Sequence, residues 1–322
     1  MSAPVITVRG VSKDYGQVVA VDNVTLDVHP GEVYALLGLN GAGKTTLIRM
    51  LLGMVRATAG CLEVTGRPVG DRRVWSQVGY LVESPSAYPE LTVRENLEVV
   101  RRLRKVDARS SVDDAIDLFG LRPYAGRRAR ALSLGNVQRL GLAKAFLHRP
   151  SLLLLDEPVN SLDPAGVVEV RDLLVSLARD HGVTVFLSSH RLGEVARVAT
   201  RIGVLHQGRL VDEFDADALA SRVRTRLEVG ARDLVRAERA LRDAGFETSD
   251  RAGSPGQADS EVLAVEDPIA LEHPELVAAA LVLAGEPPTR IAVVEEDLET
   301  YFLRLVSSTA AADVAREAPR VR

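Results

Sequence analysis

The sequence predicts an α/β domain followed by a smaller α+β domain, and three observations support this. In residues 1–214, short apolar runs alternate with helical patterns, as they do in open α/β folds. A glycine-rich turn, Gly38–Gly43, joins one of these runs to a helical pattern. The net charge changes from +4 over residues 1–214 to −8 over residues 215–322, and this change of sign indicates a domain boundary.

Composition excludes several classes of protein. Of the 322 residues, 46% are hydrophobic and 26% are charged, which is typical of a folded globular chain. No apolar stretch approaches the ~20 residues that span a bilayer, and the N-terminus lacks the charged-then-apolar order of a secretory signal. Cys61 is the only cysteine, which excludes an internal disulfide and a cysteine-based zinc site. We therefore expect a cytoplasmic protein, and the net charge of −4 argues against a nucleic-acid partner.

The elements of the first domain follow from hydrophobic spacing and from residues that begin or end helices. Short apolar runs bounded by turn residues predict strands at 5–8, 24–28, 33–37, 152–155, 183–187 and 202–205. Helical spacing of apolar residues predicts helices at 45–54, 92–104, 112–119, 135–148 and 164–181. Asp163 and Pro164 are good residues to begin the last helix, and Gly182 ends it. Because residues 84–150 are mainly helical, we expect an inserted helical lobe there.

The second domain is predicted at residues 215–306, with a flexible tail at 307–322. Its expected strands are 226–229, 246–249, 261–265 and 290–295, and its expected helices are 233–244, 274–284 and 297–306. Residues 251–260 are rich in turn-forming residues and are predicted to form a loop. This region carries no glycine-rich loop and no cluster of catalytic residue types, and no internal repeat is predicted.

Residues 38–46, Gly-Leu-Asn-Gly-Ala-Gly-Lys-Thr-Thr, fit the pattern G-x-x-x-x-G-K-[ST] between a strand and a helix. Glycines let successive backbone N–H groups turn toward phosphate oxygens, and the N-terminus of the following helix adds positive partial charge. Lys44 is predicted to bridge the β- and γ-phosphates, and the Thr45 hydroxyl to ligate Mg²⁺. The predicted nucleotide-binding residues of the loop are Gly38, Leu39, Asn40, Gly41, Ala42, Gly43, Lys44, Thr45 and Thr46. An ordinary glycine-rich turn with a surface lysine is the alternative.

Two further strand ends carry polar residues, and ligands bind at the carboxyl ends of parallel strands. Asp156 and Glu157 follow the strand at 152–155. Asp156 is predicted to reach Mg²⁺, directly or through water, and Glu157 to accept a proton from an attacking water. His190 follows the strand at 183–187 and is predicted to hydrogen-bond the γ-phosphate or that water. A solvated turn and a structural histidine are the alternatives, and the phosphate loop favours the functional interpretation.

Taken together, these motifs resemble the ATP-binding subunits of ABC transporters over roughly residues 4–214. The resemblance implies a P-loop ATPase core with an antiparallel β subdomain in addition to the helical lobe. It also implies that Tyr15 stacks on adenine and that Asp163 lies in the D-loop. Lys44, Glu157 and His190 would then be the catalytic residues.

The same resemblance places Leu132–Asn136 at the family signature, usually LSGGQ, and Glu83 at the glutamine of the Q-loop. Ser133 and Gly135 retain the hydroxyl and the close backbone approach that a phosphate needs, whereas Leu134 and Asn136 depart from the pattern. Glu83 keeps an oxygen ligand for Mg²⁺ but adds a negative charge near the phosphates. The predicted metal ligands are therefore Thr45, Glu83 and Asp156.

The family implies an ATP hydrolase that works as an ATP-sandwich dimer with a second copy of itself. Such a subunit powers a separate polytopic membrane permease from the inner face of the cell membrane. Residues 83–97 and Leu134 resemble the bacitracin and lantibiotic-resistance branch, which implies export of a drug, peptide antibiotic or similar compound.

A non-transport soluble ABC ATPase with a regulatory role remains the alternative to a transporter subunit. An ATPase that acts on DNA is disfavoured, because Ser133 follows Lys44 by only 89 positions and leaves no room for a long coiled coil. An ATPase that acts on the ribosome would carry two cassettes in one chain, and a small P-loop kinase would lack the signature.

Overall fold

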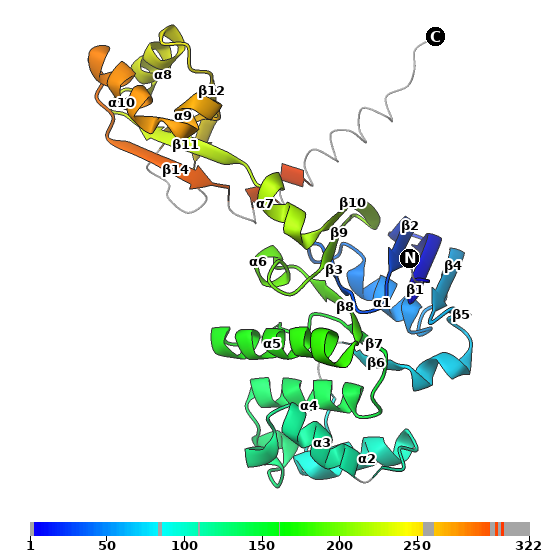
Figure 1. Ribbon diagram of the computed structural model, residues 1–322. Helices are drawn as coiled ribbons and strands as arrows, with labels where there is room; N and C mark the ends of the chain where they lie inside the picture. The colour runs from blue at the N-terminus through cyan, green and yellow to red at the C-terminus, as the bar shows by residue number, and fades with distance from the viewer. Residues whose placement is uncertain are drawn as a thin grey trace, which may run out of the picture. The chain divides into compact units, whose positions relative to one another are not determined.

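Figure 1 shows the computed structural model of the protein. The structure describes residues 3–82, 86–108, 110–160, 162–253, 261–296, 300–301 and 304–305. The chain divides into two compact units, Met1–Leu219 and Ala220–Arg322, and each is considered by itself.

The first unit is built on a six-stranded sheet with the order β10-β9-β3-β8-β7-β6. Its strands are β3 (Val33–Leu37), β6 (Val78–Leu81), β7 (Leu152–Leu155), β8 (Thr184–Ser189), β9 (Arg201–His206) and β10 (Arg209–Asp215). Strands β3 and β6 to β9 pair in parallel, and β10 pairs antiparallel with β9. All residues of β3, β7 and β8 are buried, as expected for parallel strands covered on both faces.

The register of this sheet places the carboxyl ends of β3, β7 and β8 at the same end of the sheet. Each of these strands leads into one of the predicted motifs. Leu37 of β3 pairs with Ser189 of β8, and Leu155 of β7 pairs with Leu187 of β8. The chain therefore leaves β3 toward the phosphate loop close to where Asp156 follows β7. Strand β8 also extends two residues beyond its predicted end, so Ser188 and Ser189 belong to the strand.

This part of the first unit also contains three helices: α1 (Lys44–Leu51), α5 (Pro164–His181) and α6 (Leu192–Val195). The predicted ends of α5 are confirmed: the Asp163 side chain accepts a hydrogen bond from the Gly166 N–H at 3.1 Å, and Gly182 has a φ of 65°. Helix α1 ends three residues before its predicted end, because Gly53 adopts a φ of 65° and closes the turn.

A second sheet, with the order β2-β1-β4-β5, is antiparallel throughout and confirms the expected β subdomain. Its strands are β1 (Ile6–Asp14), β2 (Val19–Val28), β4 (Ala59–Val64) and β5 (Arg67–Pro68). Strands β4 and β5 were not predicted, because most of their residues are exposed and no apolar alternation marks them. One hydrophobic core joins this sheet to α1 and to the central sheet through residues such as Val8, Val24, Leu47, Leu154 and Phe186.

The predicted helical lobe contains α2 (Val93–Leu103), α3 (Ser110–Leu118) and α4 (Leu134–Phe146), each within two residues of its expected ends. Thr92 and Glu95 form a capping box at the start of α2, where each side chain bonds the other's backbone N–H. An ion pair between Arg139 and Glu169 connects α4 to α5, which lie side by side in Figure 1. Short 3₁₀ turns occur at Arg72–Ser76, Arg122–Tyr124, Ala129–Ala131 and Ala216–Ala218.

The second unit has the element order of the ferredoxin-like split βαβ motif, β-α-β-β-α-β. Its elements are β11 (Thr225–Gly230), α8 (Leu234–Asp243), β12 (Thr248–Gly253), β13 (Glu261–Val265), α9 (Pro268–Glu272), α10 (Pro274–Leu283) and β14 (Arg290–Glu295), with α9 and α10 together in the place of the second helix. A short helix, α7 (Leu219–Arg222), precedes β11 where the first unit ends. The sheet order is β12-β13-β11-β14, and every neighbouring pair is antiparallel. Its own core is centred on residues such as Leu227, Val229, Leu241, Leu263 and Leu281.

Several details of this unit differ from the sequence-based prediction. Helix α9 was missed, because the five residues after Asp267 are too few to show helical spacing. Strand β12 extends into the predicted loop 251–260, and the rest of that loop, residues 254–260, lies outside the described residues. Residues 300–301 and 304–305 are helical, whereas most of the predicted helix 297–306 and the predicted tail 307–322 also lie outside them.

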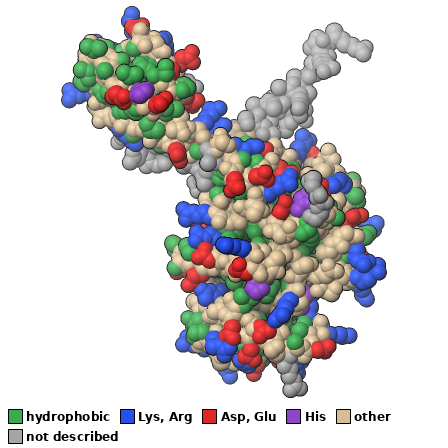
Figure 2. All heavy atoms as spheres, viewed as in Figure 1, with side chains coloured by type: hydrophobic (Ala, Val, Ile, Leu, Met, Phe, Trp, Pro, Cys, Tyr) green, Lys and Arg blue, Asp and Glu red, His purple; other side chains and the backbone are tan. Residues whose placement is uncertain are grey.

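The two βαβ halves of this unit share a helix ending that the sequence analysis did not recognise as a repeat. Ala-Leu-x-x-Ala-Gly occurs at residues 240–245, at the end of α8, and at residues 280–285, at the end of α10. Gly245 and Gly285 take φ values of 88° and 80°, and the backbone hydrogen bonds around them match. Hydrophobic side chains also gather on the surface of this unit (Figure 2). The exposed large hydrophobic residues of the unit include Ile269, Leu276, Val282 and Leu283.

Candidate nucleotide-binding and hydrolytic site

The glycine-rich loop turns sharply between β3 and α1, and two of its glycines are sterically required. A Cβ on Gly38 would approach the Leu205 carbonyl oxygen to 2.5 Å, and one on Gly43 would approach the Ala20 carbonyl oxygen to 2.2 Å. Gly43 also has a φ of 106°, and Gly41 a φ of 82°, in the left-handed region that favours glycine. The loop therefore depends on these residue types for its shape, as the phosphate-binding pattern predicts.

A cleft of about 450 Å³ opens over this loop, within the range usual for small-molecule sites. Its lining comes from the β1–β2 hairpin, the loop, the start of α1 and two later segments: Val18, Val19, Ala20, Asn40, Gly41, Ala42, Gly43, Lys44, Thr45, Thr46, Glu157 and Gln207. The fold thus brings Glu157 next to a loop more than a hundred positions earlier in the chain. Gly38 and Leu39 adjoin the cleft through contacts of their carbonyl oxygens with Lys44.

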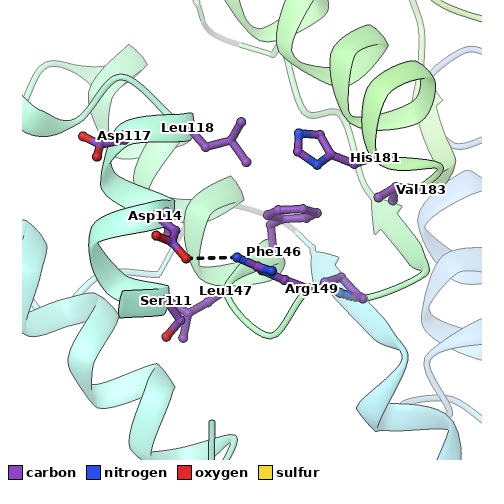
Figure 3. A pocket seen from close by; sticks show the side chains of 11 residues that line it. Ser111, Asp114, Asp117, Leu118, Phe146, Leu147, Arg149, His181 and Val183 are labelled. Carbon is purple, nitrogen blue, oxygen red and sulfur yellow. Dashed lines mark hydrogen bonds and ion pairs between the residues drawn. The ribbon is translucent and has the colours of Figure 1, made fainter. Parts of the chain in front are cut away.

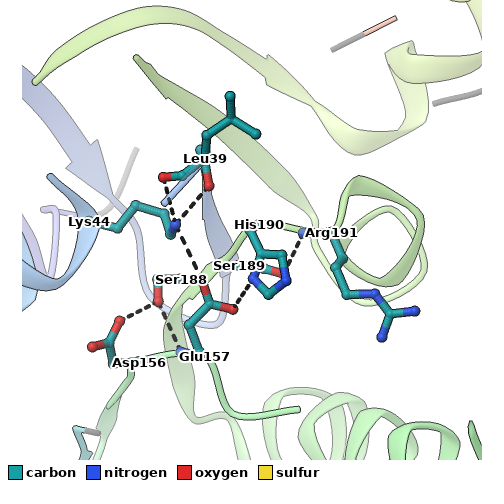
Figure 4. A network of polar contacts seen from close by, with 9 residues as sticks. Leu39, Lys44, Asp156, Glu157, Ser188, Ser189, His190 and Arg191 are labelled. Carbon is teal, nitrogen blue, oxygen red and sulfur yellow. Dashed lines mark hydrogen bonds and ion pairs between the residues drawn. The ribbon is translucent and has the colours of Figure 1, made fainter. Parts of the chain in front are cut away.

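A polar network connects the predicted catalytic residues (Figure 4). Lys44 Nζ donates hydrogen bonds to the Gly38 and Leu39 carbonyl oxygens at 2.7 and 3.2 Å, and lies 3.3 Å from Glu157 Oε1. The other carboxylate oxygen, Glu157 Oε2, lies 2.9 Å from His190 Nδ1. Glu157 therefore stands between the lysine of the phosphate loop and the histidine that follows β8.

A second part of the network lies deeper and centres on Ser188, a residue that the sequence analysis did not select. Ser188 Oγ lies 2.6 Å from Asp156 Oδ1 and 2.9 Å from the Glu157 backbone nitrogen. Ser188 is fully buried, and Asp156 is only 5% exposed. The sequence did contain a signal for Ser188, namely two serines at the end of an apolar strand. A hydroxyl that is buried there requires a hydrogen-bond partner.

Four other predicted residues do not line this cleft. Tyr15 follows β1, is 55% exposed, and has Lys13 Nζ 4.8 Å above its ring. Asp163 caps α5, and Ser133 caps α4 by accepting a hydrogen bond from the Asn136 backbone N–H at 3.4 Å. Gly135 lies in the first turn of α4. Glu83 lies outside the described residues.

In the signature segment, no close contact among the described residues requires glycine at position 135. A Cβ on Gly135 would have Leu162 as its nearest neighbour at 3.9 Å, an ordinary contact distance. Leu134 is 53% exposed. Because glycine in a helix costs stability relative to alanine, Gly135 is costly here unless another molecule approaches its backbone.

The residue types at the cleft fit a magnesium ion held jointly with phosphates. Mg²⁺ commonly takes only one or two protein carboxylates and completes its shell with phosphate oxygens and water. Thr45 supplies a hydroxyl in the cleft, and Asp156 supplies a carboxylate at the same sheet edge. Within the described part of the chain, no group of three or more His, Cys, Asp or Glu side chains forms a closed protein metal site.

A larger cleft of about 600 Å³ lies elsewhere, between α3, the end of α4 and the end of α5 (Figure 3). An ion pair of 2.9 Å between Asp114 and Arg149 crosses it, and the Phe146 and His181 rings meet edge to face with centroids 6.0 Å apart. None of its lining residues belongs to the predicted motifs. Size alone therefore does not distinguish the two clefts, whereas the smaller one is lined by residues of the predicted motifs.

A phosphate loop between a parallel strand and a helix, facing an Asp-Glu pair and a histidine at neighbouring strand ends, defines the class of P-loop ATPases. The sequence profile of the ABC transporter family matches residues 21–160. A bacitracin transport ATP-binding protein of Enterococcus faecalis is 35% identical over 94% of this chain and 96% of its own. The corresponding protein of Bacillus licheniformis is 39% identical over 70% of this chain and 74% of its own. The chain therefore belongs to the ATP-binding proteins of ABC transporters and is an ABC-type ATPase.

Further relatives agree with the predicted family and branch. A lantibiotic transport ATP-binding protein of Streptococcus pyogenes is 36% identical over 66% of this chain and 91% of its own. Among solved structures, the ATP-binding subunit of an ABC transporter superposes with a TM-score of 0.60 at 27% identity, over 68% of this chain and 92% of its own. A Clostridium perfringens subunit, described as part of an ABC transporter complex, shares the fold with a TM-score of 0.63 over the same shares of both chains.

Among the described residues, no helix is both long enough and apolar enough to cross a bilayer.

Proposed function

We propose that this chain binds and hydrolyses Mg²⁺-ATP to power export of a drug, peptide antibiotic or similar compound through a separate polytopic permease. The observation that carries the hydrolytic part is the position of Glu157, between Lys44 at 3.3 Å and His190 at 2.9 Å, on the wall of the cleft. The similarity to a bacitracin transport protein over 94% of the chain, both units included, supports the export branch.

The chain's own groups suit this chemistry. Backbone N–H groups of the loop and Lys44 would bind the phosphates, and Thr45 and Asp156 would hold Mg²⁺, which supplies compensation of negative charge. Glu157 would accept the proton of the attacking water, and His190 would orient that water through the carboxylate that it contacts. Lys44 would then exchange its carbonyl partners for phosphate oxygens, which are better partners for a buried cation.

A second copy of the chain would complete the site. Ser133 begins α4, so the hydroxyl and the helix N-terminus offer donors to an anion outside their own subunit. No close contact among the residues that the structure describes requires glycine at position 135, which supports a close approach from another molecule. A solved relative in fold is described as a dimeric ATP-binding cassette with ADP and Pi bound, at a TM-score of 0.60. These features support an ATP sandwich in which each signature contacts the nucleotide of the other copy.

A groove between β6 and the lobe helices is the proposed docking surface for the permease. It has a volume of about 240 Å³, and its lining includes Tyr80, Leu103, Arg104 and Lys144. Leu103 is 74% exposed and Tyr80 is 41% exposed, which leaves apolar surface for a partner. Burial lowers the pKa of Arg104 and of Lys144, and the hydrogen bonds they make to Trp75 and Ser86 are to backbone carbonyls. A helix with an exposed carboxylate would therefore suit this groove.

Co-purification from membranes tests the transporter assignment against a soluble regulatory role. The tagged wild-type chain should bring down a polytopic membrane protein together with ATPase activity. Leu103→Glu should lose that protein while keeping nucleotide affinity, because it places a charge in the apolar part of the groove. Met54→Glu, which changes a side chain 54% exposed outside the groove, is the matched control and should retain the partner. Recovery of wild-type chain from membranes without any membrane protein would favour the regulatory alternative.

A further inference from the structure

Ser188 contacts both acidic residues that follow β7, and it does so from a different strand (Figure 4). We propose that Ser188 is a positioning residue of the hydrolytic site, whose hydroxyl orients the Asp156 carboxylate and holds the backbone at Glu157. This inference rests on the proposed ATPase chemistry of those two residues. Ser188 itself would touch neither nucleotide nor metal.

The direction of the two hydrogen bonds follows from the groups involved. A backbone N–H can only donate and an ionised carboxylate can only accept, so the Ser188 hydroxyl accepts from Glu157 and donates to Asp156. The distances of 2.9 and 2.6 Å are normal for such bonds. This buried hydroxyl therefore both donates and accepts, and alanine would leave the Glu157 N–H without this partner.

The hydroxyl also selects between the oxygens of Asp156. It engages Oδ1, and the Asp156 backbone N–H donates to the Leu81 carbonyl oxygen at 2.8 Å. With one oxygen and the backbone held, rotation of the carboxylate is restricted and Oδ2 keeps a defined direction. A carboxylate that is fixed by such an outer partner binds a metal, or a metal-bound water, more tightly than a mobile one.

Glu157 needs support of this kind because its backbone is strained. Its φ is 48°, in the left-handed region that non-glycine residues seldom occupy. The contacts of its side chain with Lys44 and His190 would change when phosphates and water enter the cleft. The bond from its backbone to Ser188 is partly buried and does not involve those side-chain contacts, so it would persist through the cycle.

The neighbouring serine provides a matched comparison. Ser189 is 2% exposed and Ser188 is fully buried, and both belong to β8. The Ser189 hydroxyl accepts a hydrogen bond from the Arg191 N–H at 3.0 Å and is not bonded to either acidic residue. Replacing either serine with alanine removes one buried hydroxyl. Only the loss of the Ser188 hydroxyl should affect the positions of Asp156 and Glu157.

The test compares Ser188→Ala, Ser188→Thr and Ser189→Ala in the full chain. Loss of an outer partner of a metal ligand typically costs about 10- to 100-fold in metal affinity or activity. We expect Ser188→Ala to lower kcat for ATP by at least about tenfold and to raise several-fold the Mn²⁺ concentration needed for binding with ATP, measured by electron paramagnetic resonance. Affinity for ATP in EDTA should stay within about twofold, because the loop is not altered.

Ser188→Thr keeps the hydroxyl and should restore most of both quantities, whereas Ser189→Ala should resemble wild type. Wild-type Mn²⁺ affinity and kcat in Ser188→Ala would overturn the inference. Equal losses in Ser188→Ala and Ser189→Ala, with matching decreases in melting temperature, would overturn it as well, because a general packing defect would then explain them. If Ser188→Ala fails to fold, Ser188→Cys replaces it: the weak thiol donor should give losses, and wild-type values would contradict the role.

Failure of the proposed function gives a different result from failure of this inference. If the wild-type chain does not hydrolyse ATP, the proposed ATPase function is wrong. If the wild-type chain hydrolyses ATP and Ser188→Ala has the same rate and metal affinity, only the positioning role of Ser188 is wrong.

Discussion

Lys44 Nζ lies 3.3 Å from Glu157 Oε1, so the cation proposed to bind phosphate pairs with the carboxylate proposed to activate water. Their side chains are only 6% and 20% exposed. Removal of either side chain would therefore leave the other charge largely buried without this partner. Phosphates in the cleft would attract Lys44, and Glu157 would then lose its closest cation. In the proposed mechanism, nucleotide binding and the availability of the base would therefore be coupled through this one contact.

Glu157→Gln should bind ATP and hydrolyse it at least about tenfold more slowly than wild type, because an amide cannot accept the proton from water. The variant should also accumulate as a dimer with Mg²⁺ and ATP, measured by light scattering after gel filtration. A turnover rate close to that of wild type would show that Glu157 is not the catalytic base. A variant that stays strictly monomeric with Mg²⁺ and ATP would contradict the ATP-sandwich dimer.

Lys44→Ala should weaken ATP binding by at least about tenfold, since it removes the charge that faces the phosphates. Calorimetry with ATP measures this directly. Lys105→Ala is the matched control, because Lys105 is exposed in the turn after α2 and should leave ATP affinity unchanged. Equal affinities in wild type and Lys44→Ala would argue against the phosphate loop.

Tyr15→Ala should weaken ATP binding by about tenfold, because stacking of a base on an aromatic ring is worth about 1 to 3 kcal/mol. Binding of inorganic pyrophosphate, which has no base, should not change. Tyr88→Ala is a fair control, since Tyr88 and Tyr15 are 52% and 55% exposed. A loss of pyrophosphate affinity would show that Tyr15 acts on the loop instead of on adenine.

Leu241→Ala should destabilise the second unit by about 2 to 5 kcal/mol, because it opens a cavity in a core that this unit builds alone. Urea unfolding followed by circular dichroism measures the loss, and ATP affinity at low urea should remain. Leu283→Ala should change stability little, since Leu283 is 88% exposed. A loss of ATP binding in Leu241→Ala would mean that the two units fold as one.

The first unit should lose stability as the pH falls from about 6.5 toward 4, owing to His148. Burial, followed by the nearby charge of Arg104, lowers the pKa of His148 from 6.5 to about 4. In this window the unfolded chain binds a proton that the folded chain excludes, so folding becomes less favourable at lower pH. After allowance for partial exposure, we expect a loss of about 1 kcal/mol between about pH 7 and about pH 5.

His148→Gln should reduce that pH dependence, because glutamine stays neutral. Urea midpoints of both chains at the two pH values measure the difference. The same slope in wild type and variant would assign the acid sensitivity to other groups.

Elements whose signal is local were predictable. The glycine pattern of residues 38–46 and the cap at Asp163 identified a phosphate loop and the start of α5, since both depend on backbone geometry set by neighbouring residues. Strands β4 and β5 were missed because most of their residues are exposed and show little apolar pattern, and α9 because it is short. Strands β6 and β10 were not predicted either. The family assignment succeeded for the same reason as the loop, because its motifs are short and ordered along the chain.

By itself the sequence determined the α/β class, the ABC family and the residue types that phosphate and Mg²⁺ require. Tertiary structure alone decided which of those residues meet. Lys44 begins α1 after the loop that follows β3, Glu157 lies just beyond β7, and Ser188 belongs to β8. The pairing of β3 and β7 with β8 brings these three residues together. Hydrogen bonds depend on distances of about 3 Å, and spacing along a chain does not specify such distances between strands.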